Sequence, residues 1–179
     1  MPAAGKGHVC KTMRSPVGTL TLVASDDGLS GILWEHERRN RVRLTIVGHD
    51  ARHHMLCATE RQLNEYFAGE RTAFELPLDF AGTEFQQSVW RELLAIPFGE
   101  TCTYTKLATL IGHPAAVRAV GAANGRNPIS IVVPCHRVVG STGKLTGFAG
   151  GLEAKALLLS LEQNHSGGVQ NKTIRIDAI

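Results

Sequence analysis

The first third of the chain alternates apolar and polar residues in a way that is typical of a small sheet. Threonine and apolar residues alternate over residues 19–23, which predicts a strand. The turn residues Asp26-Asp27-Gly28 lead to a return strand over residues 29–35, so we expect a hairpin. Residues 44–47 predict a third strand. Residues 1–12 show no comparable pattern, and we expect a loose terminus there.

A helical period replaces this alternation in residues 53–67, and Gly69 is placed to end the helix. The strands and this helix predict a small N-terminal α+β domain over residues 1–80. We find no catalytic constellation in it, so a scaffold role is favoured. The basic run over residues 38–43 is interpreted as a solvated loop rather than a binding patch.

The remaining chain predicts a mostly helical C-terminal domain over residues 81–163 and a frayed tail over residues 164–179. Thr83 and Gln86 form a capping-box pattern at the start of a helix that extends to Leu94. A Leu-rich helix near the end of the domain is expected over residues 152–161.

Between these helices, the turn Gly112-His113-Pro114 separates two others over residues 103–111 and 115–124, with Pro114 in the first turn of the second. This layout is typical of a helix-turn-helix, and an ordinary helical hairpin shares it. The second helix consists almost entirely of Ala, Gly and Val. Arg118 is therefore a long cation on a slim helix, which can approach another backbone closely.

The strongest candidate for chemistry follows the apolar run of residues 131–133, which predicts a short buried strand or extended segment ended by Pro134. A single cysteine is most often a small buried hydrophobe. Here Cys135 is followed directly by His136 and Arg137, which a core segment does not need. Burial raises the pKa of a thiol, and a neighbouring imidazole and guanidinium lower it toward thiolate. We therefore predict a nucleophilic cysteine.

Charge and cysteine content narrow the choice of partners. Residues 91–144, which surround Cys135, hold six Lys and Arg against two Glu, so their net charge is +4 and suggests an anionic partner.

The four cysteines are far apart and form no C-x-x-C, which argues against a disulfide framework or a zinc site. His53 and Cys57 alone make a weak metal case. We expect a cytoplasmic protein, because no signal peptide or membrane span is recognisable.

Several ordered motifs, spaced consistently along the chain, resemble those of the O6-alkylguanine-DNA alkyltransferases. The matching segments are Phe85-Gln86-Gln87-Ser88-Val89-Trp90, Ile96-Pro97-Phe98-Gly99-Glu100-Thr101, Tyr104, Ala119-Val120-Gly121-Ala122-Ala123-Asn124, Asn127-Pro128, Pro134-Cys135-His136-Arg137-Val138 and Gly147-Phe148-Ala149-Gly150-Gly151-Leu152. The resemblance covers residues 82–162 well and the N-terminal half more loosely.

The resemblance implies an α+β fold, with a ribonuclease-H-like N-terminal domain before a helical domain that carries the helix-turn-helix. It implies duplex DNA as the partner, bound through the minor groove. The implied DNA-binding and base-binding residues are Tyr104, Arg118, Ala123, Asn124, Val138 and Ala149. Arg118 would enter the base stack in place of the extruded nucleotide, and Tyr104 would help rotate that nucleotide outward. The Val138 carbonyl and the Ala149 amide would recognise the base.

By the same resemblance, the catalytic residues are Cys135, His136, Glu162 and Asn127. Cys135 would take the alkyl group from O6-alkylguanine, and this expectation extends to O4-alkylthymine. His136 would remove the thiol proton through a water, Glu162 would orient His136, and Asn127 would brace the turn before the active segment. The thioether has no easy reverse step, so each molecule would act once, without a cofactor. We expect a monomer, and cooperative binding on DNA stays open.

Two departures from the family pattern and three rival functions accompany this interpretation. Ser25 and Ser30 stand where some relatives have zinc ligands, so we predict no metal, and Phe148 replaces a common tyrosine. The first rival is a protein that binds the alkyl lesion without transfer. The second is a sequence-specific transcription regulator, and the third is a cysteine hydrolase.

Overall fold

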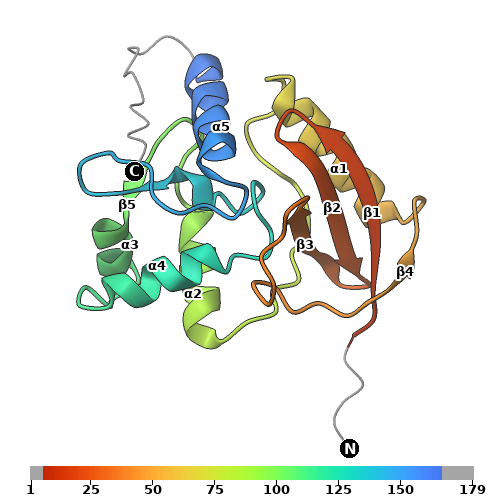
Figure 1. The fold of residues 1–179 in the computed structure, drawn as a ribbon, viewed down its shortest axis with the longest axis horizontal. Helices are drawn as coiled ribbons and strands as arrows, with labels where there is room; N and C mark the ends of the chain where they lie inside the picture. The colour runs from red at the N-terminus through yellow and green to blue at the C-terminus, as the bar shows by residue number, and fades with distance from the viewer. Residues whose placement is uncertain (1–5, 167–179) are drawn as a thin grey trace, which may run out of the picture.

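The computed structural model describes residues 6–166. Its N-terminal unit is a four-stranded sheet in the order β3-β2-β1-β4, with one helix packed on the first three strands in sequence (Figure 1). The elements are β1 (His8–Ser15), β2 (Gly18–Ser25), β3 (Gly28–Trp34), β4 (Ile46–His49) and α1 (His54–Phe67). The predicted hairpin and helix are confirmed. Gly69, at a φ of 76°, follows the end of α1 as expected.

The predicted loose terminus is wrong from His8 onward, because this segment forms β1. Residues 1–5 of that prediction lie outside the described residues. β1 pairs antiparallel with β2 up to Ser15 and Gly18, and parallel with β4 on its other side. Its buried residues are His8, Cys10 and Met13, whose irregular spacing hides the alternation that identifies a strand. β4 begins two residues later than the predicted third strand.

The C-terminal unit is mostly helical, and it lies beside the sheet unit in Figure 1. Its elements are α2 (Glu84–Leu93), β5 (Cys102–Thr103), α3 (Tyr104–Leu110), α4 (Val117–Gly125), the 3-10 turn η1 (Cys135–Arg137), β6 (Val138–Val139) and α5 (Leu152–His165). The short strands β5 and β6 pair in parallel. The capping box is confirmed, since the Thr83 hydroxyl accepts from the Gln86 amide and the Gln86 side chain accepts from the Thr83 amide. The α+β fold class is confirmed.

The start of α4 and the end of α5 differ from the sequence predictions. α4 begins at Val117, so Pro114 belongs to the preceding turn and not to the helix. α5 continues past residue 161 to His165, and it therefore includes the first residues of the predicted tail. Residues 167–179 of that tail lie outside the described residues. α3 and α4 are consecutive helices with a turn between them, and their assignment as a helix-turn-helix stays a prediction.

One apolar core runs through both units. It joins Leu22 and Ile32 of the sheet to Trp90 of α2 and Leu158 of α5, all of which are buried. Burial of this shared apolar surface stabilises the sheet unit against the helical unit. Within residues 6–166, no helix is both long enough and apolar enough to span a bilayer.

Candidate active site

A tight turn before Cys135 sets the direction of the reactive segment. Ile131 has a φ of 74°, which is unusual for a β-branched residue, so the predicted strand over residues 131–133 is wrong although the run is buried. The buried Asn127 side chain holds this turn. Its Nδ2 donates to the Val133 carbonyl at 2.8 Å, and its Oδ1 accepts from the Ile129 amide at 3.0 Å.

Cys135 lies at the start of the 3-10 turn and is only 3% exposed. Burial raises the pKa of its thiol, and Asn127, Lys155 and Arg41 oppose that rise. The sequence prediction that Arg137 supplies the activating cation is therefore wrong. The Arg137 guanidinium is turned toward Glu162 instead, where Nε lies 2.8 Å from Oε2.

His136 is fully buried, and one ring nitrogen meets a carboxylate. Its Nε2 lies 2.6 Å from Oε1 of Glu162, on α5. Burial opposes the charged form of Glu162, but hydrogen bonds from His136 and Arg137 outweigh it and lower the pKa of Glu162 to about 2. Burial lowers the pKa of His136 more than Glu162 raises it. The imidazole is thus held neutral, and its Nδ1 has no partner among the described residues.

Lys155 is a site residue that sequence reasoning missed. Its buried ammonium donates to the Val138 carbonyl at 2.6 Å and to the Thr146 carbonyl at 2.8 Å. Burial lowers its pKa to about 8 while the Cys135 thiolate favours its charge. It therefore fixes the strand after the reactive turn to the glycine-containing loop. A lysine in a Leu-rich helix is normally assigned to the solvent face. The one signal for burial is that Lys155 lies three residues before Leu158 and therefore on the same, buried face of the helix.

The N-terminal unit also reaches the site, although the sequence pattern predicts no such contact. The Tyr66 hydroxyl of α1 donates to Glu162 Oε1 at 2.7 Å. The Arg41 guanidinium donates to the Asn127 carbonyl at 2.5 Å, and Trp34 Nε1 donates to Ser130 Oγ at 3.1 Å. These contacts hold both the turn before Cys135 and the carboxylate behind His136.

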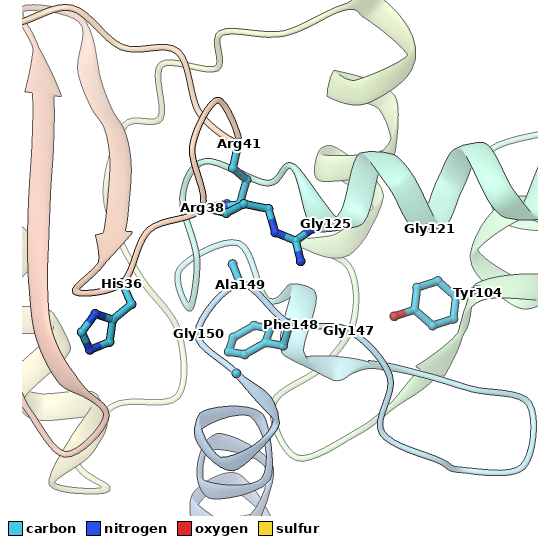
Figure 2. A pocket seen from close by; sticks show the side chains of 11 residues that line it. His36, Arg38, Arg41, Tyr104, Gly121, Gly125, Gly147, Phe148, Ala149 and Gly150 are labelled. Carbon is cyan, nitrogen blue, oxygen red and sulfur yellow. The ribbon is translucent and has the colours of Figure 1, made fainter. Parts of the chain in front are cut away.

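A pocket of about 500 Å³ opens between the two units beside this site. Tyr104 lines it on one side, and His36, Arg38 and Arg41 come from the N-terminal unit on the other (Figure 2). The remaining lining residues belong to the small-residue surface of α4 and to the segment before α5: Gly121, Gly125, Gly147, Phe148, Ala149, Gly150 and Gly151. The interpretation of residues 38–43 as only a solvated loop is therefore incomplete.

The structure brings some predicted DNA-binding residues to this pocket and separates others. Tyr104 and Ala149 line it, and the Val138 carbonyl accepts from Lys155. Arg118 is exposed on α4, away from the described pocket lining. Ala123 and Asn124 are 3% and 4% exposed, so their side chains face the interior and are not accessible to a DNA groove in this state.

Ser25 and Ser30, which stand where some relatives have zinc ligands, form ordinary hydrogen-bond contacts. The Ser25 hydroxyl donates to Asp79 Oδ2 at 2.6 Å, and the Ser30 hydroxyl lies near the Gly28 carbonyl. Within residues 6–166, no three His, Cys, Asp or Glu side chains gather as a metal site would require. That the protein binds no metal stays a prediction.

Family comparisons cover nearly all of the described chain. Residues 84–164 match the DNA binding domain of the 6-O-methylguanine DNA methyltransferases, and residues 8–80 match their ribonuclease-like domain. A methylated-DNA–protein-cysteine methyltransferase of Mycolicibacterium paratuberculosis is 48% identical over 87% of this chain and 93% of its own length. One from Methanosarcina barkeri is 45% identical over 86% of this chain and 96% of its own length.

Solved structures give the same result. The O6-methylguanine methyltransferase of Mycobacterium tuberculosis superposes with a TM-score of 0.77 at 46% identity, over 88% of this chain and 94% of that chain. A structure of the Mycobacterium tuberculosis protein in complex with DNA has a TM-score of 0.77 at 45% identity, over 89% of this chain and 94% of that chain. The chain therefore belongs to the 6-O-methylguanine DNA methyltransferase family.

Proposed function

We propose that this protein repairs DNA by irreversible transfer of the alkyl group from O6-alkylguanine in duplex DNA to Cys135. The observation that carries the proposal is the buried series Cys135, His136 and Glu162, in which the carboxylate orients an imidazole whose other nitrogen is unpartnered among the described residues. The family relationship agrees with this chemistry. In domain terms, residues 81–163 carry the reaction and residues 1–80 support it, and the same transfer extends to O4-alkylthymine.

The chemical step is a direct displacement. His136 Nδ1 takes the thiol proton through a bridging water, while Glu162 holds the ring and stabilises the resulting imidazolium. The Cys135 sulfur then attacks the alkyl carbon. A sulfur–carbon bond forms, the bond from carbon to guanine O6 breaks, and the guanine leaves with that electron pair and takes up one proton. The buried thiol is a weak acid at rest, so proton removal is tied to substrate binding.

The base must leave the stack to reach this sulfur. The pocket beside Tyr104 and Ala149 receives the extruded base. The Val138 carbonyl, which accepts from Lys155, also accepts from the base, since a carbonyl oxygen has two lone pairs. Arg118 fills the space left in the duplex. The exposed face of α4, formed by Arg118, Ala119, Ala122 and Gly125, approaches the minor groove. The protein acts as a monomer.

Asn127 and Asn124 act on neighbouring groups rather than on DNA. Asn127 holds the turn that aims Cys135. Burial raises the pKa of Tyr104, and Thr146 and Asn124 oppose that rise, so Asn124 acts on the ring that meets the base.

The test is the Cys135→Ala variant with a duplex that carries one isotope-labelled O6-methylguanine. We expect no label on the variant, full labelling of the wild type, and binding of the damaged duplex within about threefold of wild type. Cys57→Ala removes an exposed thiol elsewhere and is the matched control. Label on the Cys135→Ala protein would overturn the proposal, and lesion binding by wild type without label would favour recognition without transfer.

A further inference from the structure

The loop between β3 and β4 carries four arginines in two structural classes. Arg41 is 8% exposed, pairs with Glu37 and donates to the Asn127 carbonyl. Arg38, Arg39 and Arg43 are exposed, and none of them forms an ion pair within residues 6–166. Arg41 therefore anchors the loop to the turn after α4, and its neighbours face solvent from a fixed position.

The loop places cations on both sides of the C-terminal end of α4. Arg38 lines the pocket that also contains Gly121 and Gly125 of α4, and Figure 2 shows it across from Tyr104. Arg43 lines a second hollow, of about 500 Å³, together with Arg126, which directly follows α4. Arg126 is also exposed and has no ion pair among the described residues.

Few acidic groups oppose these cations. Residues 35–43 hold four arginines against two glutamates, which gives a net charge of +2. Glu37 is paired with Arg41, and Glu35 accepts a long hydrogen bond from the Thr19 amide. Residues 101–144, which include α3, α4 and the reactive turn, contain no Asp or Glu. Such a surface of one charge sign attracts a polyanion and repels cationic surfaces.

We propose that Arg38 and Arg43 of the N-terminal unit, with Arg126, bind backbone phosphates of the duplex that lies on α4. The N-terminal unit is then part of the DNA interface and not only a support. The inference rests on the proposed function in taking duplex DNA as the partner. Arginine suits this role because its planar guanidinium donates two parallel hydrogen bonds to one phosphate.

The experiment uses an undamaged duplex, so that no alkyl transfer is involved. Binding of wild type and of the Arg38→Gln/Arg43→Gln double variant is followed by fluorescence anisotropy between 50 and 200 mM salt, roughly the range over which phosphate contacts show. Loss of two contacts should weaken binding roughly tenfold and reduce the slope of log K against log salt by about 1.8. The charge-matched control is Arg14→Gln/Arg52→Gln, which removes two exposed cations on β1 and before α1.

Each outcome decides the inference. An unchanged salt slope in the Arg38/Arg43 variant, or an equal fall in the control, would overturn it. Because both side chains are exposed, the unfolding temperature should not change. If the Arg38/Arg43 variant shows the reduced salt slope but wild-type protein never accepts an alkyl group, the proposed function is contradicted and the phosphate-binding interface still holds.

Discussion

The sheet unit and the helical unit divide the work of the site unequally. The helical unit carries the thiol, the imidazole and the carboxylate, on the reactive turn and on α5. The sheet unit has no comparable set of reactive groups within the described residues. It nevertheless donates hydrogen bonds to the turn before Cys135, from Arg41 to the Asn127 carbonyl, and to the carboxylate behind His136, from Tyr66 to Glu162. A supporting domain can therefore act on the chemistry through two buried donors.

Substitution of Asn127, whose carbonyl accepts from Arg41 of the sheet unit, should have the largest effect on the site. Asn127→Ala leaves the Val133 carbonyl and the Ile129 amide without their partners, at about 1–3 kcal/mol for each buried group. We expect the free energy of unfolding to fall by roughly 2–6 kcal/mol and transfer to slow at least tenfold, because the turn no longer aims Cys135. Urea unfolding and single-turnover kinetics measure the two effects. Asn164→Ala, at an exposed position of α5, is the control, and a variant as stable and as fast as that control would contradict the role of the turn.

The carboxylate between the two units gives the next largest effect, and it depends on pH. The pKa of Glu162 is about 2 in the folded protein against an ordinary 4.5, so its charge stabilises the native state above pH 4.5. That stabilisation, about 3 kcal/mol, is lost as the pH falls from 4.5 toward 2. Glu162→Gln should remove this part of the pH dependence.

Chemical unfolding as a function of pH tests this, with Glu153→Gln as the control, because Glu153 is exposed on the same helix. The control should keep the wild-type curve. A Glu162→Gln protein that still loses stability between pH 4.5 and 2 as wild type does would assign the dependence to different groups.

The smallest expected effect comes from Tyr66, and it tests the hydrogen bond that the sheet unit donates to Glu162. Tyr66→Phe removes one donor from Glu162 and leaves the contacts with His136 and Arg137, so we expect a stability loss of about 1–2 kcal/mol. The less neutralised carboxylate should then raise the pKa of His136. The neutral imidazole is needed to take the thiol proton, so the acid limb of the pH–rate profile should move to higher pH. A destabilised variant with an unshifted acid limb would reduce Tyr66 to a packing role.

Sequence reasoning succeeded where the signal is local. The hairpin after Asp26, the capping box at Thr83 and the adjacent Cys135 and His136 were recognisable because turn chemistry, capping and nucleophile chemistry each involve residues close in sequence. The resemblance added Glu162, which the structure places against His136.

Sequence reasoning failed where contacts between segments distant in the sequence decide the conformation. Ile131 has high strand propensity, but Asn127 and the edge of β3 hold its backbone at a positive φ. Tyr66 and Glu162 are 96 residues apart, so no spacing rule connects them. Lys155 is buried only because two carbonyls of the folded loop receive its ammonium. These contacts exist only in the tertiary structure.

The most direct measurement is the intact mass of the wild-type protein after incubation with excess duplex that carries one O6-methylguanine. The account predicts a gain of one methyl group per protein molecule, located on the peptide that contains Cys135, with no further turnover when more damaged duplex is added. An unchanged mass, or more than one lesion repaired per protein molecule, would contradict irreversible transfer to Cys135.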